Sequence, residues 1–485
     1  MKRLNYKTLE EQNYSGYLMK TGTERMLQFG EGNFLRSFVD FFVDEMNEKS
    51  DFDCKVVVCQ PINQGLADFV NEQDGLYTLY LRGAENGESV EKKKIISSIS
   101  RCINPYNDFD EFLAVAKNPD LKFISSNTTE AGIAYDESVK FDDKPQNSFP
   151  GKLTRFMYER YKIFGGDKTK GFIILSCELI DNNGKELEKC VLKHATKWNL
   201  GQDFINWLTN ANEFCSTLVD RIATGYPRNE ADLINKGNSY EDKLIDTAEI
   251  FGLWVIEGNQ KVKEAIPFEK ANLPIIVTDD HSPYKQRKVG ILNGAHTTMV
   301  MGAYLAGQTI VRDCMEDDVI CGFVNKVMFD EVIPILSLDK SELKEFAGSV
   351  IDRFLNPFID HELLSITLNS TSKWKARVLP SLLANVEKFN TLPKCITASF
   401  AFYIEFYRKA MTSSDYDIND DDYITNFYKE NYNLKTEDLV HKICQNTDFW
   451  GTDLSKIDNF ANEVTRYMKI IEENGTYHLM SELIK

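Results

Sequence analysis

The chain has 485 residues, of which 42% are hydrophobic and 27% charged, as expected for a globular protein of roughly two to three domains. A formal net charge of −18 and a pI of about 5.0 argue against a partner such as nucleic acid or an anionic membrane surface. The N-terminal segment lacks the apolar run of a signal peptide, and no later run is long enough to span a bilayer. Ten cysteines without C-x-x-C spacing indicate a reduced, cytoplasmic protein with neither a zinc site nor a disulfide framework.

Residues 25–60 predict a strand, a glycine turn, an amphipathic helix and a second strand. The first strand is RMLQF, the turn is Gly30-Glu31-Gly32, and the second strand is the β-branched run KVVVC. A glycine turn at the first crossing of such a unit places backbone N–H groups and a helix N-terminus against a pyrophosphate. The unit therefore predicts a Rossmann-like dinucleotide-binding domain.

The glycine motif departs from its usual form in two places. Leu35 stands where a third glycine is usual, and Gln60 and Pro61 stand where an acidic residue normally follows the second strand to bind ribose hydroxyls. A generic glycine turn is therefore an alternative interpretation. No arginine or lysine immediately follows Gln60 to bind a 2′-phosphate, so we expect NAD rather than NADP.

Further segments of the sheet domain are predicted in the N-terminal half. They are LKFISSNTTEAGI (121–133), KGFIILSCELIDNNG (170–184) with FIIL as a buried strand, EFCSTLVDRIATGYP (213–227), FGLWVIEGN (251–259) and LPIIVTDDHSPY (273–284). Ser176, Cys177 and Glu178 follow FIIL, at the end of a strand where ligands sit in open α/β sheets. Asp220 and Arg221 lie within the segment 213–227, although an adjacent acid and base are more often a surface pair.

The stretch YKQRKVGILNGAHTTMV, residues 284–300, predicts a helix that begins near residue 284. Asn293 and His296 are three residues apart and share a face of this helix, and Lys288 lies about two turns before His296. A lysine, an amide and an imidazole aimed at one cleft suit proton transfer to or from an alcohol beside a stabilised oxyanion. The alternative is a surface lysine and a core histidine.

From residue 285 onward, long segments of helical period replace the glycine turns and β-branched runs. We therefore predict a Rossmann-like NAD-binding domain over residues 1–284 and a mainly α-helical substrate and catalytic domain over residues 285–485. The site is expected in the cleft between the two domains. Asp279, Asp280 and His281 are consecutive and cannot easily converge on one ion, so no metal site is predicted.

Three separated motifs carry a resemblance to a known family. They are G-x-G-N-F-x-R from Gly30 to Arg36, V-D-R-I over residues 219–222, and K-x-x-x-x-N-x-x-H from Lys288 to His296. In this order, and over a span from Gly30 to about Pro380, they resemble the polyol-specific long-chain dehydrogenases of the mannitol dehydrogenase family. The resemblance implies hydride transfer between a nicotinamide cofactor and a secondary alcohol or ketone of an open-chain sugar derivative.

The resemblance also implies roles for individual residues. Lys288 would be the general acid/base, Asn293 the donor to the oxyanion, and His296 the group that orients a substrate hydroxyl. The cofactor would be held by residues of the glycine motif and of the second strand's end: Phe29, Gly30, Gly32, Asn33, Phe34, Arg36 and Gln60. Substrate contacts would come from Lys285, Asp220, Lys373 and Arg377, although the last two could equally be surface cations.

The segment SCELI, residues 176–180, departs from the S-C-D-N-L of polyol dehydrogenases, where the asparagine helps to bind the reacting oxygen. Leu179 cannot donate a hydrogen bond, so another group, Asn182 or Asn183, would have to serve. SCELI resembles the tagaturonate reductase branch of the family, and Lys285 replaces an acidic residue of polyol-oxidising members, which suits a sugar acid. The branch implies reduction of tagaturonate to altronate. Fructuronate reductase, mannitol dehydrogenase and a nucleotide-binding regulator stay open as alternatives, as does a monomer or small homo-oligomer.

Overall fold

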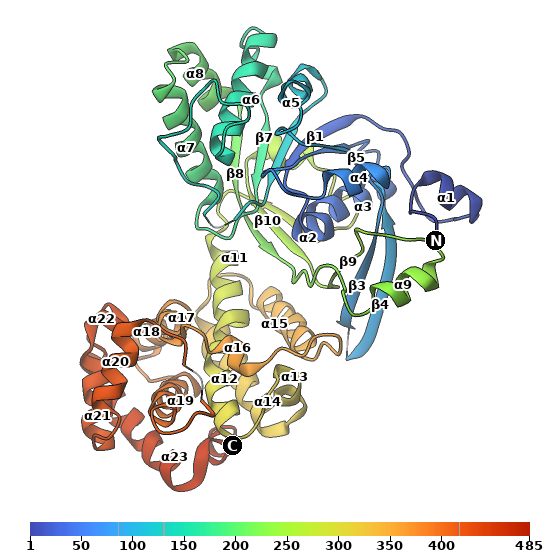
Figure 1. Cartoon of the computed structure of the whole chain (residues 1–485). Helices are drawn as coiled ribbons and strands as arrows, with labels where there is room; N and C mark the ends of the chain where they lie inside the picture. The colour runs from blue at the N-terminus through green and yellow to red at the C-terminus, as the bar shows by residue number, and fades with distance from the viewer. Residues whose placement is uncertain (86, 130, 417) are drawn as a thin grey trace. The chain divides into compact units, whose positions relative to one another are not determined.

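The computed structural model describes residues 1–85, 87–129, 131–416 and 418–485. The chain divides into two compact units (Figure 1). The first comprises residues 1–82 and 90–281, and the second comprises residues 83–89 and 282–485. The boundary between the units therefore falls after His281, whereas the sequence predicted a domain boundary after residue 284.

The first unit is built on an eight-stranded sheet with the strand order β11-β10-β8-β7-β6-β1-β2-β5. Six neighbouring strands run parallel to one another: β8, β7, β6, β1, β2 and β5. At the other edge, β10 is antiparallel to β8 and β11 is parallel to β10. The strands are β1 Glu24–Phe29, β2 Lys55–Cys59, β5 Ile99–Ile103, β6 Phe123–Ser126, β7 Ile173–Ser176, β8 Glu213–Asp220, β10 Leu253–Glu257 and β11 Ile275–Thr278.

Helices cover both faces of this sheet, which explains why its strands read as continuous apolar runs (Figure 1). One face is covered by α5 Phe109–Ala114, α6 Phe149–Ile163, α7 Asn183–Lys197 and α8 Gln202–Ala211. The opposite face is covered by a helical segment made of α2 Asn33–Leu35, a π-helical turn η1 Arg36–Asp40 and α3 Phe41–Lys49. On that face Phe38 and Phe42 pack against Trp254 of β10.

A second, three-stranded sheet in the order β4-β3-β9 was not predicted from the sequence. Its strands are β3 Tyr77–Glu85, β4 Glu88–Ile96 and β9 Asp246–Glu249. The β3 and β9 strands pair in parallel although more than 150 residues separate them, so local patterns could not reveal the pairing. The remaining helices of this unit are α1 Tyr6–Glu11, α4 Ala67–Glu72, α9 Ala231–Asn238 and α10 Gln260–Ala265.

The second unit is helical and surrounds α12 Gly294–Leu305 (Figure 1). Nearly every residue of α12 is buried, as a helix that is apolar on all sides requires. It packs against α14, α16, α17, α19 and α23. The other helices are α11 Ser282–Arg287, α13 Val311–Glu316, α14 Asp318–Asn325, α15 Lys340–Phe354, α16 Leu363–Ile366, α17 Ser370–Arg377, α18 Leu379–Phe389, α19 Lys394–Ala410, α20 Asp422–Asn431, α21 Thr436–Gln445, α22 Thr447–Trp450 and α23 Phe460–Leu483. Within the described residues, none of the helices is both long and apolar enough to cross a membrane.

Candidate active site

The glycine turn follows the carboxyl end of β1, the edge at which open α/β sheets bind dinucleotides. Gly30 has a φ of +127°, and a Cβ at this position would lie 2.8 Å from Leu35 Cδ1, so a larger residue would be strained. The Gly30 N–H donates to the carbonyl of Cys59 at 3.1 Å, which ties the turn to β2. A Cβ at Gly32 would meet no atom within 4 Å, so the turn keeps open space beside its backbone. Such a cradle at a helix start fits a pyrophosphate.

Arg36 holds the glycine turn from inside the unit. Its side chain is 1% exposed, and its Nε donates to the carbonyl of Glu31 at 3.1 Å. One Nη donates to Asn33 Oδ1 at 2.6 Å, and the other donates to the carbonyl of Leu244. Because all of its nitrogens bind the chain itself, Arg36 positions the turn, and its predicted part in cofactor binding is indirect.

The two aromatic residues of the predicted cofactor set lie in apolar surroundings. Phe29 is fully buried at the end of β1, with its ring centroid 6.1 Å from that of Phe112 and 5.0 Å from that of Phe149. Phe34 is partly buried and stacks on Phe38 at 5.0 Å. Both rings therefore fix the backbone on either side of the glycine turn.

Gln60 shapes the loop that follows β2, where an acidic residue is usual. It is 1% exposed, and its Nε2 donates to the carbonyls of Ile62 at 2.8 Å and Asn63 at 3.1 Å. Its Oε1 accepts from the N–H of Ala67 at 3.2 Å. The Gln60 amide therefore binds the backbone of the loop that follows β2. This structural role explains why an amide stands where an acidic residue is usual.

The Asp-Arg pair at the end of β8 is buried, in contrast to the surface pair that such neighbours usually form. Arg221 donates to the carbonyls of Phe251 at 2.9 Å and Ser37 at 2.7 Å, so it joins β8, the segment after β9 and the glycine-turn helix. Burial lowers the pKa of Arg221 to about 10. Asp220 is 3% exposed and ends β8, and the predicted contact of Asp220 with substrate stays a prediction.

The segment after β7 also lies at the carboxyl edge of the sheet. The Glu178 carboxylate accepts from Ser126 Oγ at 3.2 Å and from the N–H and hydroxyl of Thr128 at 3.1 and 3.2 Å. Burial raises the pKa of Glu178. Leu179, at the position of the family asparagine, is 68% exposed. Glu178 therefore braces the segment after β6, and Leu179 offers an apolar surface.

Asn183 is unavailable to replace the family asparagine. Its Nδ2 donates to the carbonyls of Glu178 at 2.9 Å and Thr217 at 3.0 Å, while its Oδ1 accepts from the N–H of Thr217 at 2.9 Å. It is 1% exposed and joins the ends of β7 and β8. Asn182, which is exposed in a left-handed conformation with φ of +52°, is the candidate that the structure leaves.

In the second unit, the predicted catalytic helix begins at Ser282 and contains a π-helical turn, η4 Lys288–Asn293. The N–H of Gly294 donates to the carbonyl of Val289, five residues earlier. Positions five apart lie about 140° apart around an α-helix, whereas the i→i+5 closure of a π turn makes them neighbours. The π turn therefore brings Lys288 and Asn293 to adjacent positions, which the predicted regular helix could not do.

The side chain of Asn293 makes no hydrogen bond with any residue that the structure describes; only its carbonyl does, accepting from Thr297 Oγ1 at 2.8 Å. Its amide is therefore available to a ligand. His296 stacks on Phe354 at 4.1 Å, and its Nε2 is enclosed without a partner among the described residues. Burial, then the neighbouring His361, lowers the pKa of His296 well below its ordinary value.

Cations surround His296. Arg377 and Lys373 on α17 both act on it electrostatically, and burial lowers the pKa of each. Lys373 Nζ donates to the carbonyl of Ile366 at 2.9 Å. Among the described residues, no carboxylate forms an ion pair with Arg377 or Lys373. Asp420 acts electrostatically on Lys373, and the cluster around His296 is otherwise rich in positive charge. Lys285 lies half-buried on α11, one turn before Lys288.

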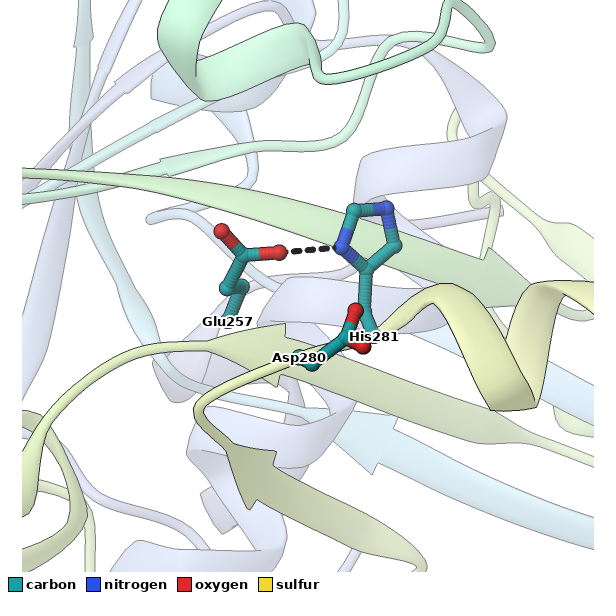
Figure 2. A group of neighbouring side chains, drawn as sticks. All are labelled: Glu257, Asp280 and His281. Atoms are coloured by element: carbon teal, nitrogen blue, oxygen red, sulfur yellow. Dashed lines mark hydrogen bonds and ion pairs between the residues drawn. The ribbon is translucent and has the colours of Figure 1, made fainter. Parts of the chain in front are cut away.

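Glu257, Asp280 and His281 bring potential metal-ligand atoms within 4.8 Å of one another (Figure 2). His281 and Asp280 follow β11, and Glu257 ends β10. Glu257 therefore joins Asp280 and His281 from a neighbouring strand, whereas the sequence considered only consecutive residues. Glu257 Oε2 lies 2.5 Å from His281 Nδ1, and Oε1 lies 2.5 Å from Lys185 Nζ. Lys185 and His281 therefore share the Glu257 carboxylate, one on each oxygen.

The glycine turn at the carboxyl edge of the parallel sheet gives the first unit the form of a dinucleotide-binding domain. Residues 24–270 match the mannitol dehydrogenase Rossmann domain, and residues 280–472 match the mannitol dehydrogenase C-terminal domain. The chain therefore belongs to the mannitol dehydrogenase family. These matches confirm the predicted family, the predicted fold class and an NAD-dependent dehydrogenase.

Proteins of known name are similar along the whole chain. An altronate oxidoreductase of Cronobacter sakazakii is 43% identical over 98% of this chain and 100% of its own length. One from Escherichia coli O7:K1 is 44% identical over 97% of this chain and 98% of its own. Among solved structures, Pseudomonas fluorescens mannitol 2-dehydrogenase in complex with NAD and D-mannitol has a TM-score of 0.67 at 19% identity, covering 99% of both chains. A substrate-free D-sorbitol dehydrogenase has a TM-score of 0.76 at 20% identity, covering 95% of this chain and 96% of its own. These two structures share the fold.

Proposed function

We propose that this protein reduces the ketone of an open-chain hexuronate, converting tagaturonate to altronate with NADH, and that the reaction is reversible. The observation that carries the proposal is the π turn, which makes Lys288 and Asn293 neighbours on the helix surface. Altronate oxidoreductases at 43–44% identity over nearly the full chain support the choice of substrate.

Bound NADH supplies the hydride. The glycine turn holds the pyrophosphate with backbone N–H groups that follow Gly30, whose own N–H is bonded to Cys59, and Arg36 keeps that backbone in shape. As the ketone is reduced, the ammonium of Lys288 donates a proton to the substrate oxygen, and in the reverse direction its amine accepts that proton. The Asn293 amide donates a hydrogen bond to the same oxygen while negative charge develops there.

His296 acts as a neutral group, because burial disfavours its charged form. Its Nε2, which lacks a partner among the described residues, meets a substrate hydroxyl. The cations Arg377 and Lys373, together with Lys285, contact the substrate carboxylate. A neutral polyol or ketose has no group to match this charge, which favours a sugar acid over mannitol or fructose.

The proposed function also assigns a role to each unit and a cellular compartment to the enzyme. We infer that the first unit binds the nucleotide and that the second unit supplies the acid/base and substrate groups. Asp220 is retained as a proposed substrate contact. We also infer that the enzyme works in the cytoplasm; all ten cysteines are unpaired, in keeping with a reducing environment.

The experiment for this proposal is a Lys288→Ala variant assayed for NADH oxidation with tagaturonate. We expect kcat to fall about 10²-fold to 10⁴-fold, the usual contribution of a general acid, while NADH still binds. Lys344→Ala, which removes an exposed lysine on α15, is the matched control and should keep full activity. Unchanged turnover of Lys288→Ala would overturn the assigned role.

A further inference from the structure

The carboxylate of Glu31 lies in the middle of the glycine turn, between Gly30 and Gly32, and is incompletely bonded. It is 8% exposed, and its Oε1 accepts from the N–H of Leu66 at 3.4 Å, the limit of a hydrogen bond. Its Oε2 is enclosed and has no partner among the described residues. Burial raises the pKa of Glu31, as expected for a carboxylate with too few donors.

The Glu31 side chain reaches the end of β2, the place of the missing ribose-binding acid. A Cβ at Gly65 would lie 2.1 Å from Glu31 Oε1 and 2.5 Å from Gln60 Cδ, so all three residues meet under the loop that follows β2. Gln60 cannot serve a ribose, because its amide binds Ile62, Asn63 and Ala67. The glycine turn thus brings the Glu31 carboxylate to this corner.

We propose that Glu31 binds the 2′- and 3′-hydroxyls of the adenosine ribose and so selects NAD over NADP, in place of the acid that usually ends the second strand. The ribose hydroxyls supply the donors that Oε2 lacks. The exposed loop residues 62–65 pass beside this carboxylate. They are held by the bonds from Gln60 to Ile62 and Asn63 and by the weak contact from Leu66, and the hydroxyls reach Oε2 when this loop shifts. A 2′-phosphate in the same place would face a buried negative charge.

Losing a hydrogen bond to a charged group costs about 1.5–3 kcal/mol, or roughly 10-fold to 100-fold in affinity. The experiment is isothermal calorimetry on the full-length protein without sugar acid, with NADH, NADPH and the NADH analogue that lacks the adenosine 2′-hydroxyl. Wild type should bind NADH at least about 10-fold more tightly than either of the others. Because no sugar acid is present, an error in the proposed substrate leaves this result untouched.

Glu31→Gln should weaken NADH binding about 10-fold or more and shrink the difference between NADH and the deoxy analogue, since the partner of the hydroxyl is gone. Asp68→Asn removes an exposed carboxylate from the first turn of α4, just after the same loop, and should change nothing. Wild type that binds the deoxy analogue as tightly as NADH would overturn the proposal, and this result needs no variant to fold. If Glu31→Gln weakened the binding of NADH and of the deoxy analogue equally, the proposal would also be overturned. That result would mean that Glu31 only supports the loop and does not bind the 2′-hydroxyl.

Discussion

Lys288 and Asn293 stand at the two ends of one π-helical turn and are adjacent on the helix surface although five residues separate them. The Asn293 side chain makes no hydrogen bond to any described residue, so its amide can bind a ligand. In the proposed reaction, this relationship gives Lys288 as general acid and Asn293 as oxyanion donor a shared target, the reacting oxygen.

Asn293→Ala should lower kcat about 10²-fold to 10³-fold with little change in KM, because the lost hydrogen bond strengthens only as charge develops. Steady-state kinetics with tagaturonate would measure both constants. A variant that raises KM alone would show that Asn293 binds the substrate uniformly and does not stabilise the oxyanion.

His296 should contribute no ionisation to the activity profile above pH 6. Burial and the neighbouring cations lower its pKa well below the ordinary 6.5, so the imidazole stays neutral throughout that range. His296→Gln should lower kcat/KM about 10-fold, as loss of a neutral hydrogen bond does, without changing the shape of the profile from pH 6 to 9. Disappearance of a titration near pH 6.5 in the variant would contradict a neutral His296.

The sequence predicted the glycine turn, most of the large sheet and the helical second unit because each shows in local periodicity or in local turn chemistry. It could not show that Lys288 and Asn293 are neighbours, because a regular helix places them apart and only a π turn joins them. The bonds of Arg36 to Leu244 and of Arg221 to Ser37 join residues about 200 positions apart, so both arginines looked like site or surface residues. Glu257 was likewise missed as the partner of His281, because β10 and β11 bring them together only in the folded sheet.

Arg377→Gln should raise KM for the hexuronate about 10-fold to 100-fold and leave the weak activity toward a neutral ketose unchanged, since Arg377 has no ion-pair partner among the described residues. Lys375→Gln, an exposed cation two residues away on the same helix, is the matched control. Lys285→Ala tests the third proposed contact in the same way, by the ratio of kcat/KM for acid and ketose. An unchanged ratio in both variants would remove these cations from the carboxylate site.

Asp40→Asn should make the stability of the first unit less dependent on pH. Asp40 accepts from Gln28 at 3.0 Å but has a second oxygen without a partner among the described residues, and burial raises its pKa to about 7. Between the unfolded value near 3.9 and this folded value, the folded state holds a proton that the unfolded chain has lost. Stability therefore falls as pH rises through this window, by an amount on the order of a few kcal/mol.

Thermal unfolding of Asp40→Asn and wild type from pH 5 to 8 would measure the effect. The unfolding temperature of the variant minus that of wild type should become more positive as pH rises. Asp68→Asn, at an exposed acid, should show no such trend. A constant difference for Asp40→Asn would mean that the Asp40 carboxyl ionises normally.

NADH oxidation by the purified protein, in the presence of a chelator, with tagaturonate, fructuronate and fructose assayed in parallel, tests the proposed reaction. We expect rapid turnover of tagaturonate, with kcat/KM at least about 100-fold above that for fructose, because its carboxylate would meet the cations near His296. Turnover of fructose at a rate equal to or above that of tagaturonate would contradict it, and preference for fructuronate would assign the same chemistry to the other epimer.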